Sequence, residues 1–113
     1  MTFDDYKVVI LEQAEKDITE ILDYIYYDLK NLQAAKKLRV DIREAIVRAR
    51  MFPYAMPIIK NEVLTLGNEY RRLDVNNYAL LYKIIEDLKE IHIMAVLYGP
   101  SNMVSKVLSR VEI

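Results

Sequence analysis

Hydrophobic and polar residues alternate on both sides of the pair Asn76-Asn77. Before the pair, Leu73 and Val75 alternate with Arg72 and Asp74. After it, one face carries Tyr78, Leu80, Tyr82 and Ile84. Period-two alternation is typical of strands with one face on a core, and paired asparagines tolerate the positive φ of a tight hairpin turn. The pattern therefore predicts antiparallel strands at 70–75 and 78–85, whose second face carries Arg72, Asp74, Ala79, Leu81 and Lys83.

The N-terminal half has the periodicity of one strand followed by two helices. A short β-branched run in 6–11 predicts a buried strand, and apolar residues recur at helical spacing over 13–29. Asn31 suits the N-cap of a second helix, which ends before Pro53. The apolar stripe of this helix is Ala35, Leu38, Ile42, Ala45, Ile46 and Ala49. Because the connection between the helices is short, we expect an antiparallel helical hairpin.

The last strand is predicted at 90–98 and is apolar on both faces. One face is predicted to carry His92, Met94, Val96 and Tyr98, and the other Ile91, Ile93, Ala95 and Leu97. Such a strand is either covered on both sides within the chain or offers its second face to a partner. A short terminal helix is predicted at 103–110. The order β-α-α-β-β-β-(α) predicts one α+β domain over residues 1–113, with the helical hairpin packed on one face of a small antiparallel-rich sheet.

The composition excludes several kinds of chemistry. The 113 residues include no cysteine, one histidine and two glycines. Disulfides, thiolate metal sites, histidine metal clusters and glycine-rich phosphate loops are therefore excluded, and we expect no metal and no cofactor. The N-terminus lacks a signal-peptide pattern, and the longest stretch without Asp, Glu, Lys or Arg, residues 91–105, is too short to span a bilayer. These features predict a cytoplasmic protein with no membrane partner.

The net charge of −1 hides an asymmetry along the chain. Residues 1–29 contain two basic and eight acidic side chains, whereas residues 30–50 contain seven basic and two acidic ones. A nucleic-acid-binding domain is usually strongly basic overall, so we expect no direct DNA binding. The basic block at 30–50 is either a solvated helix face that pairs with the acidic first helix or a docking surface for an acidic partner.

Two side chains of the last strand are candidates for chemistry. His92 is either a hydrogen-bonded residue on a covered face or a general base, which its ordinary pKa near neutrality would permit. Tyr98 lies at the strand end just before Gly99, where a phenol could reach a ligand or partner.

Four segments together resemble the RelE/ParE superfamily of type II toxin–antitoxin toxins, also labelled plasmid stabilisation proteins. They are Tyr6-Lys-Val-Val-Ile10 with the helix after it, Asn31-Leu-Gln-Ala-Ala35 with its continuation to Pro57, Tyr70-Arg-Arg-Leu-Asp-Val75 with Asn77-Tyr-Ala-Leu-Leu-Tyr82, and Ile91-His-Ile-Met-Ala-Val-Leu-Tyr-Gly99. The resemblance covers nearly the whole chain, and its specificity lies in the order of the pieces.

The superfamily divides by mechanism. RelE-like members resemble ribosome-dependent endoribonucleases, which cut messenger RNA with basic side chains on the concave sheet face. ParE-like members are similar to them in scaffold but act by binding DNA gyrase, without catalysis of their own. In this chain Asp74, Ala79 and Pro100 stand where RNA-cutting relatives carry cations, and Tyr98 stands where many carry histidine. The resemblance therefore favours a ParE-like protein.

The ParE-like interpretation implies a growth-inhibiting toxin that binds DNA gyrase and is neutralised by a cognate antitoxin, which we expect to cover the apolar second face. The predicted antitoxin- or target-binding residues are Arg72, Leu81, Lys83, Ile85, Met94, Val96 and Tyr98. One alternative is a RelE-like messenger RNA endoribonuclease that acts on the ribosome. Its site would be built from Arg71, Arg72, Lys83, His92 and Tyr98. The other alternative is a non-toxic relative that retains only antitoxin binding.

Overall fold

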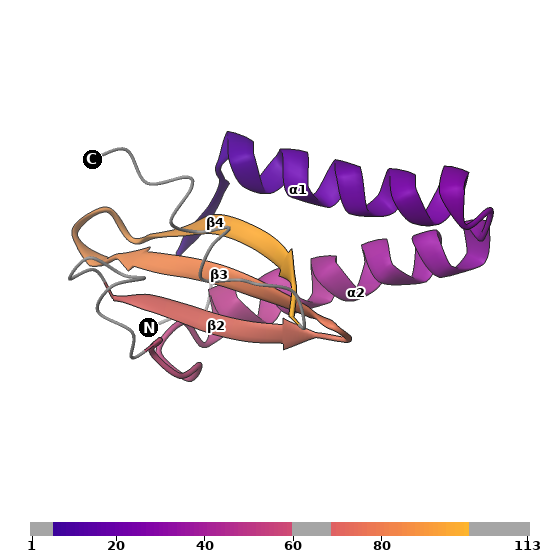
Figure 1. The fold of residues 1–113 in the computed structure, drawn as a ribbon. Helices are drawn as coiled ribbons and strands as arrows, with labels where there is room; N and C mark the ends of the chain where they lie inside the picture. Colours follow the sequence, from indigo (N-terminus) through magenta and orange to yellow (C-terminus); the bar gives the residue numbers. More distant parts are fainter. Residues whose placement is uncertain (1–5, 60–68, 100–113) are drawn as a thin grey trace.

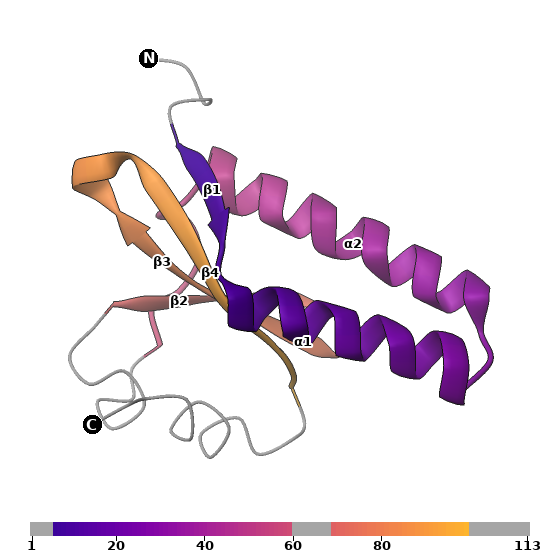
Figure 2. The same cartoon turned by 90° about the horizontal axis from the view of Figure 1, so that it is seen from above.

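Two helices pack on one face of a four-stranded sheet in the computed structural model, which describes residues 6–59 and 69–99 (Figure 1). The elements are β1 (Lys7–Ile10), α1 (Glu12–Asp23), the π-helical turn η1 (Tyr24–Asp28), α2 (Leu32–Met51), β2 (Tyr70–Val75), β3 (Tyr78–Ile85), the 3₁₀ turn η2 (Glu86–Leu88) and β4 (Glu90–Tyr98). Figure 2 shows both helices on the same side of the sheet. The predicted α+β class and helical hairpin are confirmed, and the helix predicted at 103–110 lies outside the described residues.

The strands follow the order β1-β4-β3-β2. β2, β3 and β4 are antiparallel neighbours, whereas β1 pairs in parallel with β4, from Lys7 opposite Glu90 to Ile10 opposite Ile93. β1 therefore forms an edge of the sheet. The prediction of a buried first strand is wrong in this respect, because Lys7 is exposed and the three residues after it are only half-buried. An edge strand contacts the rest of the sheet on one side only.

The helical hairpin forms largely where the periodicity predicts it. The Asn31 side chain accepts a hydrogen bond from the Ala34 amide at 3.0 Å, as an N-cap should. The predicted stripe of α2 faces inward, and five of its six residues are buried: Ala35, Leu38, Ile42, Ala45 and Ala49. The first helix differs from the prediction at its end, because it continues beyond Asp23 as the π-helical turn η1. None of the helices in the described ranges combines the length and apolarity that a membrane span requires.

The two turns of the sheet use residues with positive φ. Asn76 has φ 54°, as predicted for the hairpin turn between β2 and β3, and Lys89 has φ 53° before β4. Asparagine adopts this left-handed conformation more readily than most residues. Lysine has no such preference, so the turn at Lys89 depends on its surroundings, which include an ion pair between its ammonium group and Glu86.

A β-bulge in β4 changes which residues share a face. Leu81 of β3 lies opposite Ala95, but the next residue, Tyr82, lies opposite Ile93, so Met94 is an extra residue in β4. A bulge of this kind shifts the alternation of the strand by one position. The residues of β4 beyond the bulge therefore face the opposite way from the predicted pattern, which put His92 and Val96 on one face.

The bulge is supported by a buried carboxylate on α1. β1 ends opposite Ile93, so the N–H groups of β4 beyond that point lack a partner in β1. Asp17, which is 5% exposed, accepts a hydrogen bond from the Val96 amide at 3.0 Å and another from the Gln13 side chain at 3.2 Å. An unsatisfied buried amide is costly, so Asp17 stabilises the position where α1 crosses β4.

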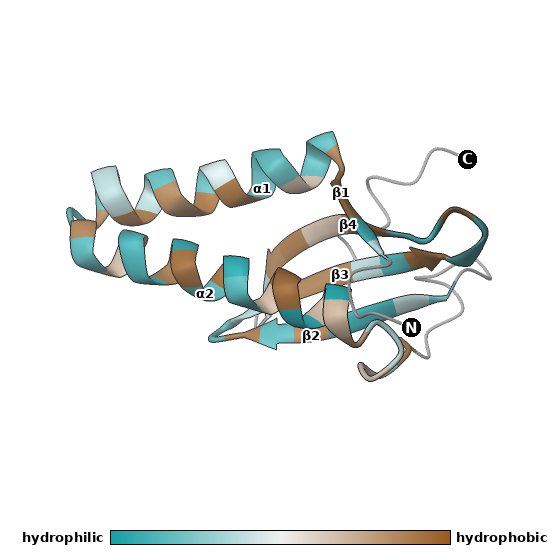
Figure 3. Ribbon diagram, turned by 180° about the vertical axis from the view of Figure 1, so that it is seen from behind, coloured by the Kyte–Doolittle hydropathy of each residue, from teal (hydrophilic) through white to brown (hydrophobic). Residues whose placement is uncertain are grey.

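Both faces of the sheet carry buried apolar residues. The helix-side core includes Leu73, Leu80, Tyr82, Ile93 and Val96 together with the stripe of α2. On the other face, which we call the second face, Ala79, Leu81, Ala95 and Leu97 form a smaller cluster, and Ile59 and Met94 pack against it. Figure 3 shows hydrophobic positions along the strands as well as along the helices. The central strands are thus covered on both sides, which is one of the two outcomes predicted for β4.

A polar cluster ties three segments together at the turn between β3 and β4. The Glu86 carboxylate accepts hydrogen bonds from the Tyr6 hydroxyl at 2.6 Å and the Tyr54 hydroxyl at 2.7 Å, and it pairs with Lys89. Lys89, followed by the two phenols, lowers the pKa of Glu86 to about 2. The hydrogen bond to Glu86 is also the main reason that the pKa of Tyr54 rises to about 12.

The depressed pKa of Glu86 predicts an acid-dependent loss of stability. The folded state keeps the carboxylate ionised down to about pH 2, whereas the unfolded chain protonates it near its ordinary pKa of 4.5. Its stabilising contribution is therefore present above pH 4.5 and is lost as the pH falls toward 2. We expect the urea midpoints of the wild type and Glu86→Gln to differ most above about pH 5 and to converge below it. A difference that stays constant from neutral to acidic pH would contradict this assignment.

Candidate functional site

Polar side chains cross three strands on the second face. Tyr70 of β2 lies opposite Lys83 of β3, and Lys83 lies opposite His92 of β4. The neighbouring row toward the η2 turn pairs Ile85 with Glu90. The His92 Nε2 atom lies 3.0 Å from the Glu90 carboxylate, and both side chains are about one-quarter exposed. The structure thus places Lys83 and His92 side by side, with an acidic group next to the imidazole.

Arg72 lies on the same face but is engaged by a carboxylate. Its Nε atom forms an ion pair with the Asp74 carboxylate at 2.7 Å. Together with Asn76, Asn77, Tyr78 and Gly99 these residues line an open hollow of about 260 Å³ at the end of the hairpin. The Gly99 amide donates a hydrogen bond to the Asn77 carbonyl oxygen at 2.7 Å.

The absence of a Cβ atom at Gly99 favours this close approach. A Cβ atom at residue 99 would lie 3.1 Å from the Asn77 carbonyl oxygen and 3.6 Å from the Arg72 guanidinium. A larger residue would therefore push against the hairpin turn and narrow the hollow beside Arg72. Two elements distant in sequence, the end of β4 and the turn after β2, are fixed together at this point.

Arg71 does not join the candidate catalytic residues on the second face. It lies opposite Tyr82, which belongs to the helix-side core, whereas Arg72 lies opposite Leu81. The Arg71 guanidinium donates hydrogen bonds to the carbonyl oxygens of Met56 at 2.6 Å and Tyr54 at 3.1 Å, and it lies 5.1 Å from the centre of the Tyr54 ring. Its role in this structure is to hold the segment after α2 against β2.

Tyr98 also lies apart from Lys83 and His92. It is opposite Tyr78, and the two rings meet edge to face with centroids 5.6 Å apart. Tyr78 packs against the helix-side core, and burial, followed by the neighbouring Tyr98 and Tyr24 phenols, raises its pKa. Of the five residues proposed for a nuclease site, the second face therefore brings together Arg72, Lys83 and His92 but neither Arg71 nor Tyr98.

Of the apolar residues predicted to bind a partner, some lie on the second face and one lies in the helix-side core. Ile85 and Met94 are partly exposed, and Met94 packs against the cluster on the second face. Leu81 is on the predicted face but is only 3% exposed within the chain itself. Val96 is 1% exposed and belongs to the helix-side core, so the prediction that it faces a partner is wrong, and the bulge at Met94 is the reason.

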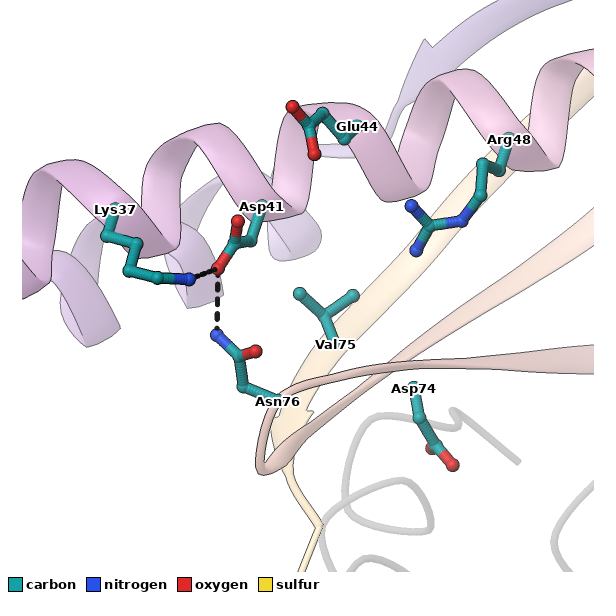
Figure 4. A pocket seen from close by; sticks show the side chains of 7 residues that line it. All are labelled: Lys37, Asp41, Glu44, Arg48, Asp74, Val75 and Asn76. Atoms are coloured by element: carbon teal, nitrogen blue, oxygen red, sulfur yellow. Dashed lines mark hydrogen bonds and ion pairs between the residues drawn. The ribbon is translucent and has the colours of Figure 1, made fainter.

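A second open hollow lies between α2 and the end of β2. It measures about 300 Å³ and is lined by Lys37, Asp41, Glu44, Arg48, Asp74, Val75 and Asn76 (Figure 4). Asp41 accepts hydrogen bonds from Lys37 at 2.8 Å and from the Asn76 amide at 3.1 Å, and these contacts lower the pKa of the Asp41 carboxyl. The ion pair of Lys37 with Asp41 and the Asn76–Asp41 hydrogen bond together join the hairpin turn to α2.

The second face has the groups for acid–base chemistry but few cations to hold a phosphate. His92 and Lys83 are adjacent, which would suit proton transfer. Stabilising the charge that develops during phosphodiester cleavage requires cationic or hydrogen-bond-donating groups aimed at the phosphate. Carboxylates accompany two of the basic groups, Asp74 beside Arg72 and Glu90 beside His92.

The fold defined by these elements is similar to that of RelE. The structure is similar to the crystal structure of an archaeal RelE–RelB complex from Pyrococcus horikoshii OT3, with a TM-score of 0.50. The match covers 85% of this chain and 97% of the other, at 18% sequence identity. At this identity the likeness establishes the fold.

Comparison with protein-family models identifies the family to which the chain belongs. The model described as the ParE toxin of the type II toxin–antitoxin system parDE matches residues 8–103. The match spans most of the sequence, so the chain belongs to this family of toxins. No curated protein matches the sequence. The resemblance to the RelE/ParE superfamily is thereby confirmed.

Proposed function

We propose that this toxin inhibits DNA gyrase by binding it, without cutting RNA, and that a cognate antitoxin covers part of its second face. The observation that carries the proposal is that carboxylates lie beside two basic side chains of the second face. Arg72 is held by Asp74 at 2.7 Å, and His92 lies 3.0 Å from Glu90. An incoming RNA phosphate would meet these acidic groups together with the bases. That arrangement opposes phosphate binding, whereas it is compatible with a protein–protein interface.

The exposed rim of the second face suits a protein partner. Ile85 and Met94 offer partly exposed apolar surface, and Arg72 and Lys83 are half-buried beside them. Apolar side chains framed by arginine are typical of the centres of protein interfaces. The presence of an antitoxin protein in the structurally similar RelE–RelB complex supports an antitoxin partner for this chain.

The juxtaposition of Lys83 and His92 favours a second candidate function. These two side chains lie directly opposite each other and could act as an acid and a base in ribosome-dependent cleavage of messenger RNA. Arg72 would then have to release Asp74 in order to contact a phosphate. This candidate predicts codon-specific cleavage that depends on both Arg72 and His92.

Two assays separate the candidates. We expect the purified toxin to inhibit ATP-dependent supercoiling by purified gyrase and to give no cleavage products in primer extension on ribosomes paused with an open A site. Removal of one electrostatic contact commonly lowers a catalysed rate by about 10²–10³-fold. Here the Arg72 guanidinium is already paired with Asp74, so it is not available to a phosphate. Codon-specific cuts that disappear in Arg72→Ala and His92→Gln, with supercoiling unaffected, would overturn the proposal. Circular dichroism of both variants controls for folding.

A further inference from the structure

Exposed apolar and basic side chains share the outer face of α2. The apolar members are Leu32, Val40 and Val47, which are 44%, 50% and 41% exposed. The basic members are Lys36, Arg39 and Arg43, all exposed. We call these six residues the outer stripe. At 3.6 residues per turn, positions 32, 36, 39, 40, 43 and 47 share one face of the helix, opposite the buried stripe that includes Leu38 and Ala45, so these side chains point away from the sheet.

Contacts among residues 6–59 and 69–99 do not account for these side chains. β-Branched valine is among the weaker helix formers, and an exposed valine on a helix surface gains nothing from packing. Within the described residues, Lys36, Arg39 and Arg43 form no ion pair, whereas the neighbouring Lys37 pairs with Asp41. Single exposed hydrophobic residues are common, but three that share one stripe with cations form an amphipathic surface.

The two acidic residues of α2 lie outside the outer stripe. Asp41 points toward Asn76 of the hairpin turn, as Figure 4 shows, whereas Glu44, which also lines this hollow, lies one helical turn from Val40 at the border of the outer stripe. The outer stripe therefore combines positive charge and aliphatic surface with no carboxylate of its own. Along α2 it extends from Leu32 to Val47, about 22 Å at the rise of an α-helix.

We propose that the outer stripe of α2 docks an acidic amphipathic helix of a partner protein. The apolar face of that helix would lie on Val40, Val47 and Leu32, and its flanking carboxylates would pair with Lys36, Arg39 and Arg43. The aliphatic side chains between the cations favour a protein helix over nucleic acid, which is held by phosphate contacts and by stacking on aromatic rings. The net charge of −1 for the whole chain also disfavours nucleic acid as the partner.

The surface is separate from the proposed antitoxin- and target-binding face. α2 packs against the helix side of the sheet, whereas Arg72, Lys83 and Met94 belong to the second face (Figure 2). A helix bound to the outer stripe would leave the exposed rim of the second face, which includes Lys83 and Met94, accessible. Docking at the outer stripe is therefore a property separate from the proposed gyrase inhibition, and either could be present without the other.

The experiment uses the full chain and a synthetic peptide of four helical turns, with leucine every third or fourth residue and glutamate on both flanks. We expect saturable binding in fluorescence anisotropy that weakens as the salt concentration rises. A matched peptide with lysine in place of glutamate should bind at least tenfold more weakly. Labelled single- and double-stranded oligonucleotides of similar length serve as the polyanion probes.

Variants of the toxin locate the site. The charge reversals Lys36→Glu with Arg43→Glu, and separately the substitutions Val40→Ser with Val47→Ser, should each weaken peptide binding at least tenfold. Lys16→Glu is the matched control, because it reverses one exposed charge on α1 and should leave the affinity unchanged. Thermal unfolding midpoints close to that of the wild type establish that the variants are folded. The neutral variant Arg43→Gln serves in place of the charge reversals should these unfold.

Three results would overturn the inference. Equal affinity for the glutamate and lysine peptides would show that charge does not select the partner. Tighter binding of an oligonucleotide than of the acidic peptide, abolished by the same charge reversals, would assign the stripe to nucleic acid. A dimer in light scattering that dissociates when Val40 and Val47 are replaced would show that a second copy of the chain occupies the stripe.

Discussion

Leu81→Asp is expected to unfold the protein. Leu81 is 3% exposed and lies between Ala79 and Ala95 in the cluster on the second face, so a carboxylate there would be buried without a partner. An isolated buried charge costs several kcal/mol, a large part of the roughly 5–15 kcal/mol that stabilises a domain. We expect the cooperative urea transition to be lost or shifted to much lower concentration, as followed by circular dichroism.

Met94→Asp is the matched control on the same face. Met94 is the extra residue of the bulge and is only partly buried, so its replacement should cost about 1 kcal/mol or less in stability. Under the proposed function, the same variant should bind the antitoxin more weakly while remaining folded. A Leu81→Asp protein as stable as Met94→Asp would show that the second-face cluster is not buried in solution.

Removal of the Asp17 carboxylate is expected to have the next largest effect. Asp17→Ala leaves the Val96 amide without its acceptor and exposes the bulge of β4 to rearrangement. Loss of a buried hydrogen bond to a charged group typically costs about 1.5–3 kcal/mol. Chemical denaturation should therefore show a lower midpoint, with an unchanged dependence on denaturant concentration, because the area exposed on unfolding is the same.

Asp17→Asn provides the graded comparison. The asparagine oxygen can still accept from the Val96 amide, so we expect a smaller loss of stability than for alanine. Hydrogen exchange should show faster exchange of the Val96 amide in Asp17→Ala than in Asp17→Asn. Equal stability of the alanine variant and the wild type would contradict the role assigned to this carboxylate.

Most of the fold could be predicted from the sequence because the elements have clear periodicities. The alternation around Asn76 defined the hairpin, and the stripe from Ala35 to Ala49 defined the inner face of α2. The site was predicted less well because β4 is apolar at nearly every position from Ile91 to Leu97. Such a strand offers no alternation that would reveal an extra residue, so the bulge at Met94 left no sequence signal.

Two features of the sequence do indicate the observed positions of Arg71 and Asp17. Arg71 and Arg72 are adjacent in a strand, so period-two alternation alone separates them onto opposite faces. Asp17 lies three residues after Ala14 and one before Ile18, on the apolar side of α1, where an acidic residue calls for a buried donor. The identity of that donor could not be predicted, because it belongs to β4, 79 residues further along the chain.

The place of β4 in the sheet has a consequence for synthesis of the toxin. Among the strands of the described ranges β4 comes last in sequence, yet it lies between β1 and β3. A nascent chain that has not yet released residues 90–98 from the ribosome lacks the partner that β1 requires and exposes one edge of β3. Pairing over such a sequence separation is slow to form, and synthesis proceeds at roughly 5–20 residues per second. The sheet is therefore completed only after β4 has been synthesised, and a chain released before β4 is made cannot assemble the sheet that carries the candidate site.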